Sequence, residues 1–220
     1  MFSGFTKETS DLFWELCFNN ERPWFMAHKQ DFEELIYKPF KALAEETAEI
    51  LTKKNPLFEP ALHISRIYRD ARRLYGRGPY KENLWFSIKS TNALNENASF
   101  FFDLSPSSYA YGMGFYCMKS ADMESFRKSV LANPNAFETL ALQIDSSPKL
   151  IIEGEMYKKP KGDFGETINN WFNRKWVSVI FKDDFGGELF SPDLPKILAD
   201  TYEFLLPMYT FLTEHSNNII

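Results

Sequence analysis

The sequence lacks the features that mark secreted, membrane-spanning or metal-binding proteins. Its 220 residues include only two cysteines and three histidines, and these form no CxxC or HExxH pattern. No run approaches the roughly 18 apolar residues that a membrane-spanning helix needs. The opening stretch MFSGFTKETSD has no basic region followed by an apolar one, as a signal peptide would. We therefore expect a cytoplasmic protein with no cofactor and no metal.

The sequence also contains no repeat, no low-complexity tract and no segment that resembles a linker. Hydrophobic residues make up 44% of it and aromatic residues 17%, with 22 phenylalanines, which is ample material for a core. A chain of this length suits one large domain or two small ones. Because no linker is evident, we expect a single domain over residues 1–220.

The spacing of apolar residues predicts helices first, then strands, then helices and strands again. Helical spacing appears over residues 6–18 and 24–53, where Pro39 is expected to kink or divide the helix. Alternation predicts strands at 61–69, 83–90, 98–104 and 108–116. Beyond them we expect helices capped by Ser120 and Asn133, strands at 149–157 and 176–182, a helix at 166–173 and a long helix opened by Ser191. This order predicts an α+β domain with a mainly antiparallel sheet packed against several helices.

The charge is unevenly distributed along the chain. The net charge is −5, yet RIYRDARRLYGRGPYK at 66–81 carries six basic residues and one acidic residue. Arginine offers a planar fork of donors that grips carboxylate or phosphate, so this segment is a candidate anion site. The alternative is that its arginines pair with carboxylates elsewhere in the chain. Nucleic-acid binding needs a broad basic face, and the acidic remainder of the chain argues against it.

Two other short segments allow both a structural and a functional interpretation. Gly112-Met113-Gly114 lies inside a strand pattern, which indicates a bulge or a close backbone approach, or a place where a ligand meets bare backbone. Residues 19–25, NNERPWF, follow the first predicted helix. They are either a helix corner anchored by two aromatic residues or part of a pocket wall.

Together these segments resemble the domain of unknown function 2461 family. The resemblance rests on NNxxxWF, RDxR followed by PYK, GxG before an arginine-bearing helix, and a later KPKG. The matching residues are Asn19, Asn20, Trp24, Phe25, Arg69, Asp70, Arg72, Pro79, Tyr80, Lys81, Gly112, Gly114, Arg127 and residues 159–162. Arg73 and Gly76 depart from the pattern, where the family usually has an aromatic residue and an acid. The resemblance implies no established activity or cofactor.

The leading hypothesis is a small-molecule site for a ligand that bears phosphate or carboxylate. Arg69, Arg72 and Lys81 would hold the anion, with Tyr80, Trp24 and Asn20 around the ligand and bare backbone at Gly112 and Gly114. Asp70 would orient Arg72 or act as an acid or base, and whether catalysis follows is left open. The alternative hypothesis is a protein-interaction module in which the arginines form internal ion pairs.

Overall fold

The N-terminal part of the chain is helical, as expected. The computed structural model describes residues 1–91, 98–115 and 120–214. Its first elements are α1 (Lys7–Phe18), α2 (Arg22–Ala27), α3 (Lys29–Phe32), the π-helical turn η1 (Glu33–Tyr37) and α4 (Lys38–Lys54). At the start of α1 the Thr6 amide donates to the Thr9 hydroxyl over 3.2 Å. The helix ends at Phe18, and the Asn19 amide after it donates to the Glu15 carbonyl.

The helix predicted over residues 24–53 is divided, and Pro39 accounts for one of the breaks. A proline has no amide hydrogen, so the carbonyl four residues earlier, that of Leu35, loses its helical partner. The chain widens into η1 just before this proline. The Thr9 hydroxyl on α1 then donates to the Leu35 carbonyl over 3.0 Å, which supplies the missing donor. A second break, which we did not predict, falls at His28 between α2 and α3.

The described strands form one antiparallel sheet with the order β1-β2-β3-β4-β6-β5. They are β1 (Pro60–Ile64), β2 (Leu84–Ser90), β3 (Ala98–Leu104), β4 (Ser108–Phe115), β5 (Ile151–Glu153) and β6 (Ser178–Asp184). Residue 116, the last of a predicted strand, lies outside the described residues. The antiparallel sheet with helices before and after it confirms the predicted α+β class.

Two predicted strands are longer than the observed ones. β1 ends at Ile64, after which the chain continues as an irregular ribbon with an isolated bridge between Tyr68 and Tyr80. The strand predicted at 149–157 is reduced to the three residues of β5. Gly154 ends it with a φ of 152°, at a point where an added Cβ would lie 1.9 Å from the Trp176 carbonyl oxygen. The backbone turns there because glycine permits this conformation.

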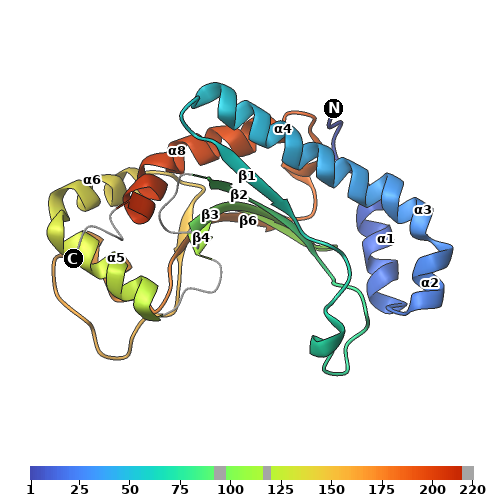
Figure 1. Cartoon of the computed structure of the whole chain (residues 1–220), viewed down its shortest axis with the longest axis horizontal. Coiled ribbons are helices and arrows are strands. Elements are labelled where there is room, and N and C mark those ends of the chain that lie inside the picture. The colour runs from blue at the N-terminus through green and yellow to red at the C-terminus, as the bar shows by residue number, and fades with distance from the viewer. Residues whose placement is uncertain (92–97, 116–119, 215–220) are drawn as a thin grey trace.

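One face of the sheet is buried beneath two helices. α4 and α8 (Leu194–Glu214) cross it in Figure 1, and α8 contacts β3 and β4. The buried side chains beneath them alternate along β2, β3 and β4: Leu84, Phe86, Ile88, Phe100, Phe102, Leu104, Tyr109, Tyr111 and Met113. Alternation also predicts Phe115 on this face, but Phe115 lines the cavity on the opposite side. The core therefore lies between this face and the helices.

Two tyrosines of α8 tie that helix to the sheet. The rings of Tyr202 and Tyr209 stack on Phe100, with centroids 5.0 and 4.8 Å apart. The Tyr202 hydroxyl donates to the Phe101 carbonyl over 2.8 Å, and the Tyr209 hydroxyl accepts the Ser90 amide over 2.9 Å. Both hydroxyl groups therefore have a hydrogen-bond partner although their rings are buried.

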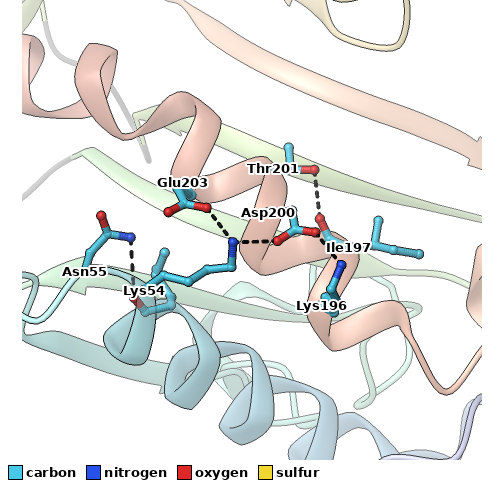
Figure 2. Close-up of polar contacts among 8 residues, drawn as sticks. Lys54, Asn55, Lys196, Ile197, Asp200, Thr201 and Glu203 are labelled. Atoms are coloured by element: carbon cyan, nitrogen blue, oxygen red, sulfur yellow. Dashed lines mark hydrogen bonds and ion pairs between the residues drawn. The ribbon is translucent and has the colours of Figure 1, made fainter.

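Ion pairs also join the exposed edges of α4 and α8. Lys54, at the end of α4, lies 2.8 Å from Asp200 and 2.5 Å from Glu203, and Lys196 lies 3.1 Å from Asp200 (Figure 2). The hydrogen bonds to both acids raise the pKa of Lys54. Exposed pairs of this kind contribute little to stability. The apolar contacts beneath them therefore dominate the packing of the two helices.

The remaining elements flank the sheet. They are η2 (Ala71–Arg73), α5 (Ser120–Ala132), α6 (Pro134–Asp145), α7 (Glu166–Phe172) and η3 (Gly187–Phe190). α5 and α6 lie at the opposite end of the molecule from α1, α2 and α3 (Figure 1). Among the described residues, no helix has both the length and the apolar character that crossing a membrane requires.

Candidate functional site on the open face of the sheet

The face of the sheet opposite α4 and α8 holds a cavity of about 810 Å³. Every strand of the sheet contributes to its lining. In Figure 1 this face looks away from α4 and α8, and no helix of the described segments lies across it. The volume falls in the range of about 300–1,000 Å³ that is typical of small-molecule sites. We call this surface the open face.

Strand register determines which side chains meet on the open face. Paired residues of antiparallel strands point to the same side, so each row across the sheet can be followed from strand to strand. One row runs through His63, Ser87, Phe101, Gly112 and Ile180. The next runs through Trp85, Asp103, Ala110 and Lys182. The open face therefore combines aromatic, acidic and basic side chains from distant parts of the chain.

Small residues make the middle of the open face hollow. Ser99, Gly114 and Ser178 pair in succession across β3, β4 and β6. A Cβ on Gly114 would lie 2.2 Å from the Ser178 hydroxyl oxygen, and one on Gly112 would lie 2.0 Å from the Val179 carbonyl oxygen. Both glycines therefore allow β4 to lie close against β6, which is the structural interpretation of the GMG segment. Larger side chains, such as Trp85, Phe101 and Phe115, enclose the hollow.

Asp103 is the acidic group on the open face whose pKa is shifted by its surroundings. Its carboxylate accepts a hydrogen bond from the Asn83 side-chain amide over 2.6 Å. Burial raises the pKa of Asp103, and the bond from Asn83 opposes that rise only in part. A carboxyl group of this kind exchanges its proton at a higher pH than an ordinary aspartate. It is therefore suited to hydrogen-bonding or proton transfer with a molecule in the cavity.

A ring pair and an ion pair lie at opposite edges of the open face. The His63 ring on β1 packs against the Trp85 indole, with centroids 5.2 Å apart. At the other edge Lys182 of β6 donates to Glu153 of β5 over 2.6 Å. The cavity thus has an aromatic side and a charged side. Both surround a centre lined by serine, alanine and glycine.

The basic segment 66–81 forms a hairpin that continues the β1–β2 ribbon beyond the sheet (Figure 1). Asn20 fixes this hairpin to the helical region. Its side-chain amide donates to the Tyr80 carbonyl over 3.0 Å and accepts the Tyr80 amide over 2.9 Å. Phe25 stacks on the Tyr80 ring with centroids 4.1 Å apart. The NNxxxWF and PY segments are therefore in contact.

Both arginines that were predicted to bind an anion have partners within the chain. Arg69 donates to the Tyr80 carbonyl over 2.6 Å and pairs with Glu82 at 3.0 Å. Arg72 is exposed and pairs with Asp70 at 2.7 Å. The Asp70 carboxylate thus holds the Arg72 guanidinium in place. Internal pairing of this kind is what the alternative hypothesis describes for the arginines.

Lys81 lies in a more positive environment. Its ammonium group is half-buried, and no carboxylate in the described part of the chain lies within ion-pair distance of it. Burial lowers the pKa of Lys81, and the charges of Arg66 and Arg69 lower it further. Trp24, by contrast, stacks on His28 with centroids 4.2 Å apart. Of the predicted site residues, Asn20, Arg69, Tyr80 and Lys81 come together at the hairpin.

The sequence analysis did not single out His63, Asn83, Asp103 or Glu153. One signal was present, because alternation separated the buried residues of β2 and β3 from the polar residues between them. That pattern does not say whether the polar side faces solvent or encloses a cavity.

In the segments that the structure describes, no three His, Cys, Asp or Glu side chains gather as a metal site would require.

The chain belongs to the family described as conserved hypothetical protein (DUF2461), whose model matches residues 8–211. The family resemblance suggested by the sequence is thereby confirmed. The match spans the sheet, the hairpin and the helices on both sides of them. No curated protein matches the chain. The family description names no activity, so function has to be argued from the site.

We predict that Asp103 makes the protein less stable as the pH rises. A raised pKa means that the folded state holds this proton at a pH where the unfolded state has lost it. The free energy of unfolding therefore falls as the pH rises through and above the ordinary value of 3.8. Asp103→Asn removes this loss. Its stability relative to the original protein should increase between about pH 4 and pH 7, as measured by urea unfolding. Free energies of unfolding that change with pH in the same way in both proteins would contradict the prediction. The control is Asp184→Asn, because the Asp184 side chain is exposed.

We also predict that Asn20 anchors the hairpin. Asn20→Ala leaves the amide of buried Tyr80 without a partner and its carbonyl with Arg69 alone, which should cost about 1–3 kcal/mol. Amide hydrogen exchange at Tyr80 should accelerate at the same time. Asn19→Ala is the matched control, because that neighbouring side chain is exposed and only donates to Glu15 at the end of α1. Equal losses in the two variants would show that the contact with Tyr80 contributes nothing particular.

Proposed function

We propose that the protein binds a small organic molecule in the cavity of the open face. The observation that carries this proposal is a partly desolvated carboxyl group, that of Asp103, in a cavity of about 810 Å³ with aromatic walls. Small-molecule sites combine apolar walls with a few polar groups that fix the ligand's orientation.

The surroundings of the cavity suggest the chemistry of the ligand. Trp85 and Phe101 offer flat apolar surfaces, and Trp85 is held against His63. A ring or another flat group suits these walls. Asp103 and Asn83 then face a donor or a shared proton on the ligand. Whether Asp103 only binds or also transfers a proton distinguishes a binding protein from an enzyme, and the proposal includes binding alone.

Anion binding at the hairpin is a second candidate function, which the environment of Lys81 favours. A half-buried ammonium group near Arg66 and Arg69 is a position where an anion gains Coulomb energy. Phosphate or carboxylate on a small ligand would satisfy it, with Arg72 as a further donor. We also propose that the protein is cytoplasmic, because its sequence contains only two cysteines.

The cavity proposal predicts the effect of two variants. A thermal-shift screen of flat heterocycles and aromatic acids should yield compounds that raise the unfolding midpoint. For such a compound, Trp85→Ala should weaken binding roughly tenfold, because one wall is lost. Ala110→Trp should abolish binding by filling the centre of the cavity. Isothermal titration calorimetry measures both effects.

Trp176→Ala is the control for this experiment. Trp176 is partly exposed and lies outside the cavity lining, so its removal should leave the affinity unchanged. If compounds bind equally well to the Ala110→Trp variant, the open face is not their site. The heat of binding is measured at a temperature where each variant is folded, so a loss of affinity is not confused with unfolding.

The hairpin candidate predicts a different result. Inorganic phosphate should stabilise the protein more than chloride does at equal ionic strength, and Lys81→Gln should reduce the difference. The exposed Lys29→Gln, which keeps the hairpin intact, should leave it unchanged. A phosphate effect that is undiminished in Lys81→Gln would exclude the hairpin as a source.

A further inference from the structure

A second group of cations lies at the other end of the molecule, on α5 and the loop beyond β5. Arg127 of α5 is only 9% exposed. Its Nε donates to the Phe172 carbonyl over 2.9 Å and its Nη2 to the Arg174 carbonyl over 2.7 Å. The remaining nitrogen, Nη1, donates to no atom of the described residues. A buried arginine is normally paired with a carboxylate, and this one is bonded only to neutral carbonyls.

Arg174 has neutral partners as well. Its guanidinium donates to the Asn170 and Gly154 carbonyls, each over 2.6 Å, and to the Asn170 side-chain oxygen over 2.7 Å. Burial lowers the pKa of Arg174. The carbonyl dipoles stabilise its charge without neutralising it. This end of the molecule therefore holds two partly buried positive charges.

The Tyr157 ring contacts Arg127 and also a third cation, Lys161. The Arg127 guanidinium carbon is 5.3 Å from the centroid of the Tyr157 ring, and the Lys161 ammonium nitrogen is 4.7 Å from it. Two cations thus share one aromatic ring, although like charges repel each other. Of the acids in the described residues, none lies within 4 Å of the charged groups of Arg127, Lys161 or Arg174. The nearby Glu155 pairs with Lys175 instead.

The loop that carries Lys161 is held in place. Asn173 accepts the Lys161 amide over 2.6 Å and the Gly162 amide over 3.3 Å, and donates to the Gly162 carbonyl over 3.1 Å. Asn173 is buried, so these bonds are shielded from water. The backbone beside Lys161 is therefore fixed relative to α7 and to Arg127. Arg127 is thus held in place by its hydrogen bonds, and the exposed Lys161 side chain extends from a fixed backbone.

We propose that Arg127, Lys161 and Tyr157 form a binding site for a phosphate group. An arginine with an unused donor, an exposed ammonium group and a phenol hydroxyl are the groups that coordinate a tetrahedral dianion. A bound phosphate would neutralise charges that have no acidic partner among the described residues. This site is independent of the proposed cavity and of the hairpin, since it uses none of their residues.

The competing explanation is purely structural: the arginines tie α5, α7 and β5 together through backbone carbonyls. Lys161 separates the two explanations, because its side chain is exposed and donates no hydrogen bond within the described residues. Its removal therefore leaves the structural ties in place while it removes one anion ligand. Lys159 is an exposed lysine two residues away in the same loop and provides a matched control.

The test uses inorganic phosphate and the full chain. At ten times its dissociation constant, phosphate should raise the unfolding midpoint by about 3–6 °C relative to chloride of equal ionic strength. In the Lys81→Gln background, from which any contribution of the hairpin is removed, Lys161→Gln should remove most of the remaining rise, and Lys159→Gln should not. Tyr157→Phe, which keeps the ring and removes the hydroxyl, should reduce it. Phosphorus NMR line broadening on the same variants gives a readout that does not depend on stability.

Four results would overturn the proposal. One is a midpoint that phosphate does not change relative to chloride. Another is equal loss of the effect in Lys159→Gln and Lys161→Gln, which would indicate general charge attraction. The third is an equal effect of acetate, which would indicate a carboxylate site. A phosphate effect lost in Lys81→Gln and kept in Lys161→Gln would likewise assign the anion to the hairpin.

Discussion

The packing of α8 onto Phe100 and its neighbours determines which face of the sheet is core and which is open. Tyr202 and Tyr209 place their rings on β3 and their hydroxyls on backbone atoms of β2 and β3. With one face filled by aromatic residues, the polar residues of the same strands are directed to the other side. The cavity therefore follows from one-sided burial of an alternating sequence, with the narrow β4–β6 contact at Gly112 and Gly114 shaping its floor.

Single asparagine side chains hold both flanks of the sheet. Asn20 binds the amide and carbonyl of Tyr80, and Asn173 binds backbone groups of the 161–162 segment. A side-chain amide can imitate the pairing of a neighbouring strand, because it offers one acceptor and two donors. In each case the fixed segment carries lysine or arginine beside the bound backbone. Motifs that look like ligand-binding groups in the sequence therefore serve at least in part to position cationic loops.

Local sequence predicted those parts of the structure that local forces determine. The span of α1 followed from the helical spacing of its apolar residues, and the buried faces of β2, β3 and β4 followed from alternation. The short β5 was missed because Gly154 turns the chain against Trp176, a contact between segments that the sequence does not place together. The partners of Arg69 and Arg72 were likewise open, since a run of cations does not show which carboxylates face it. Asp103 was missed for the same reason, because its burial depends on neighbouring strands.

The order of the strands has a consequence for how the molecule assembles. β3 and β4 are joined by three residues, whereas β4 and β6 are separated by about 60 residues that include α5, α6, β5 and α7. Closing the longer loop costs roughly 3 kcal/mol more in chain entropy. The meander of β1 to β4 consists of nearer neighbours, and contacts between near neighbours form fastest. The hollow at Gly114 and Ser178 spans the distant junction, so the cavity is complete only once the entropically most expensive pairing of the sheet has formed.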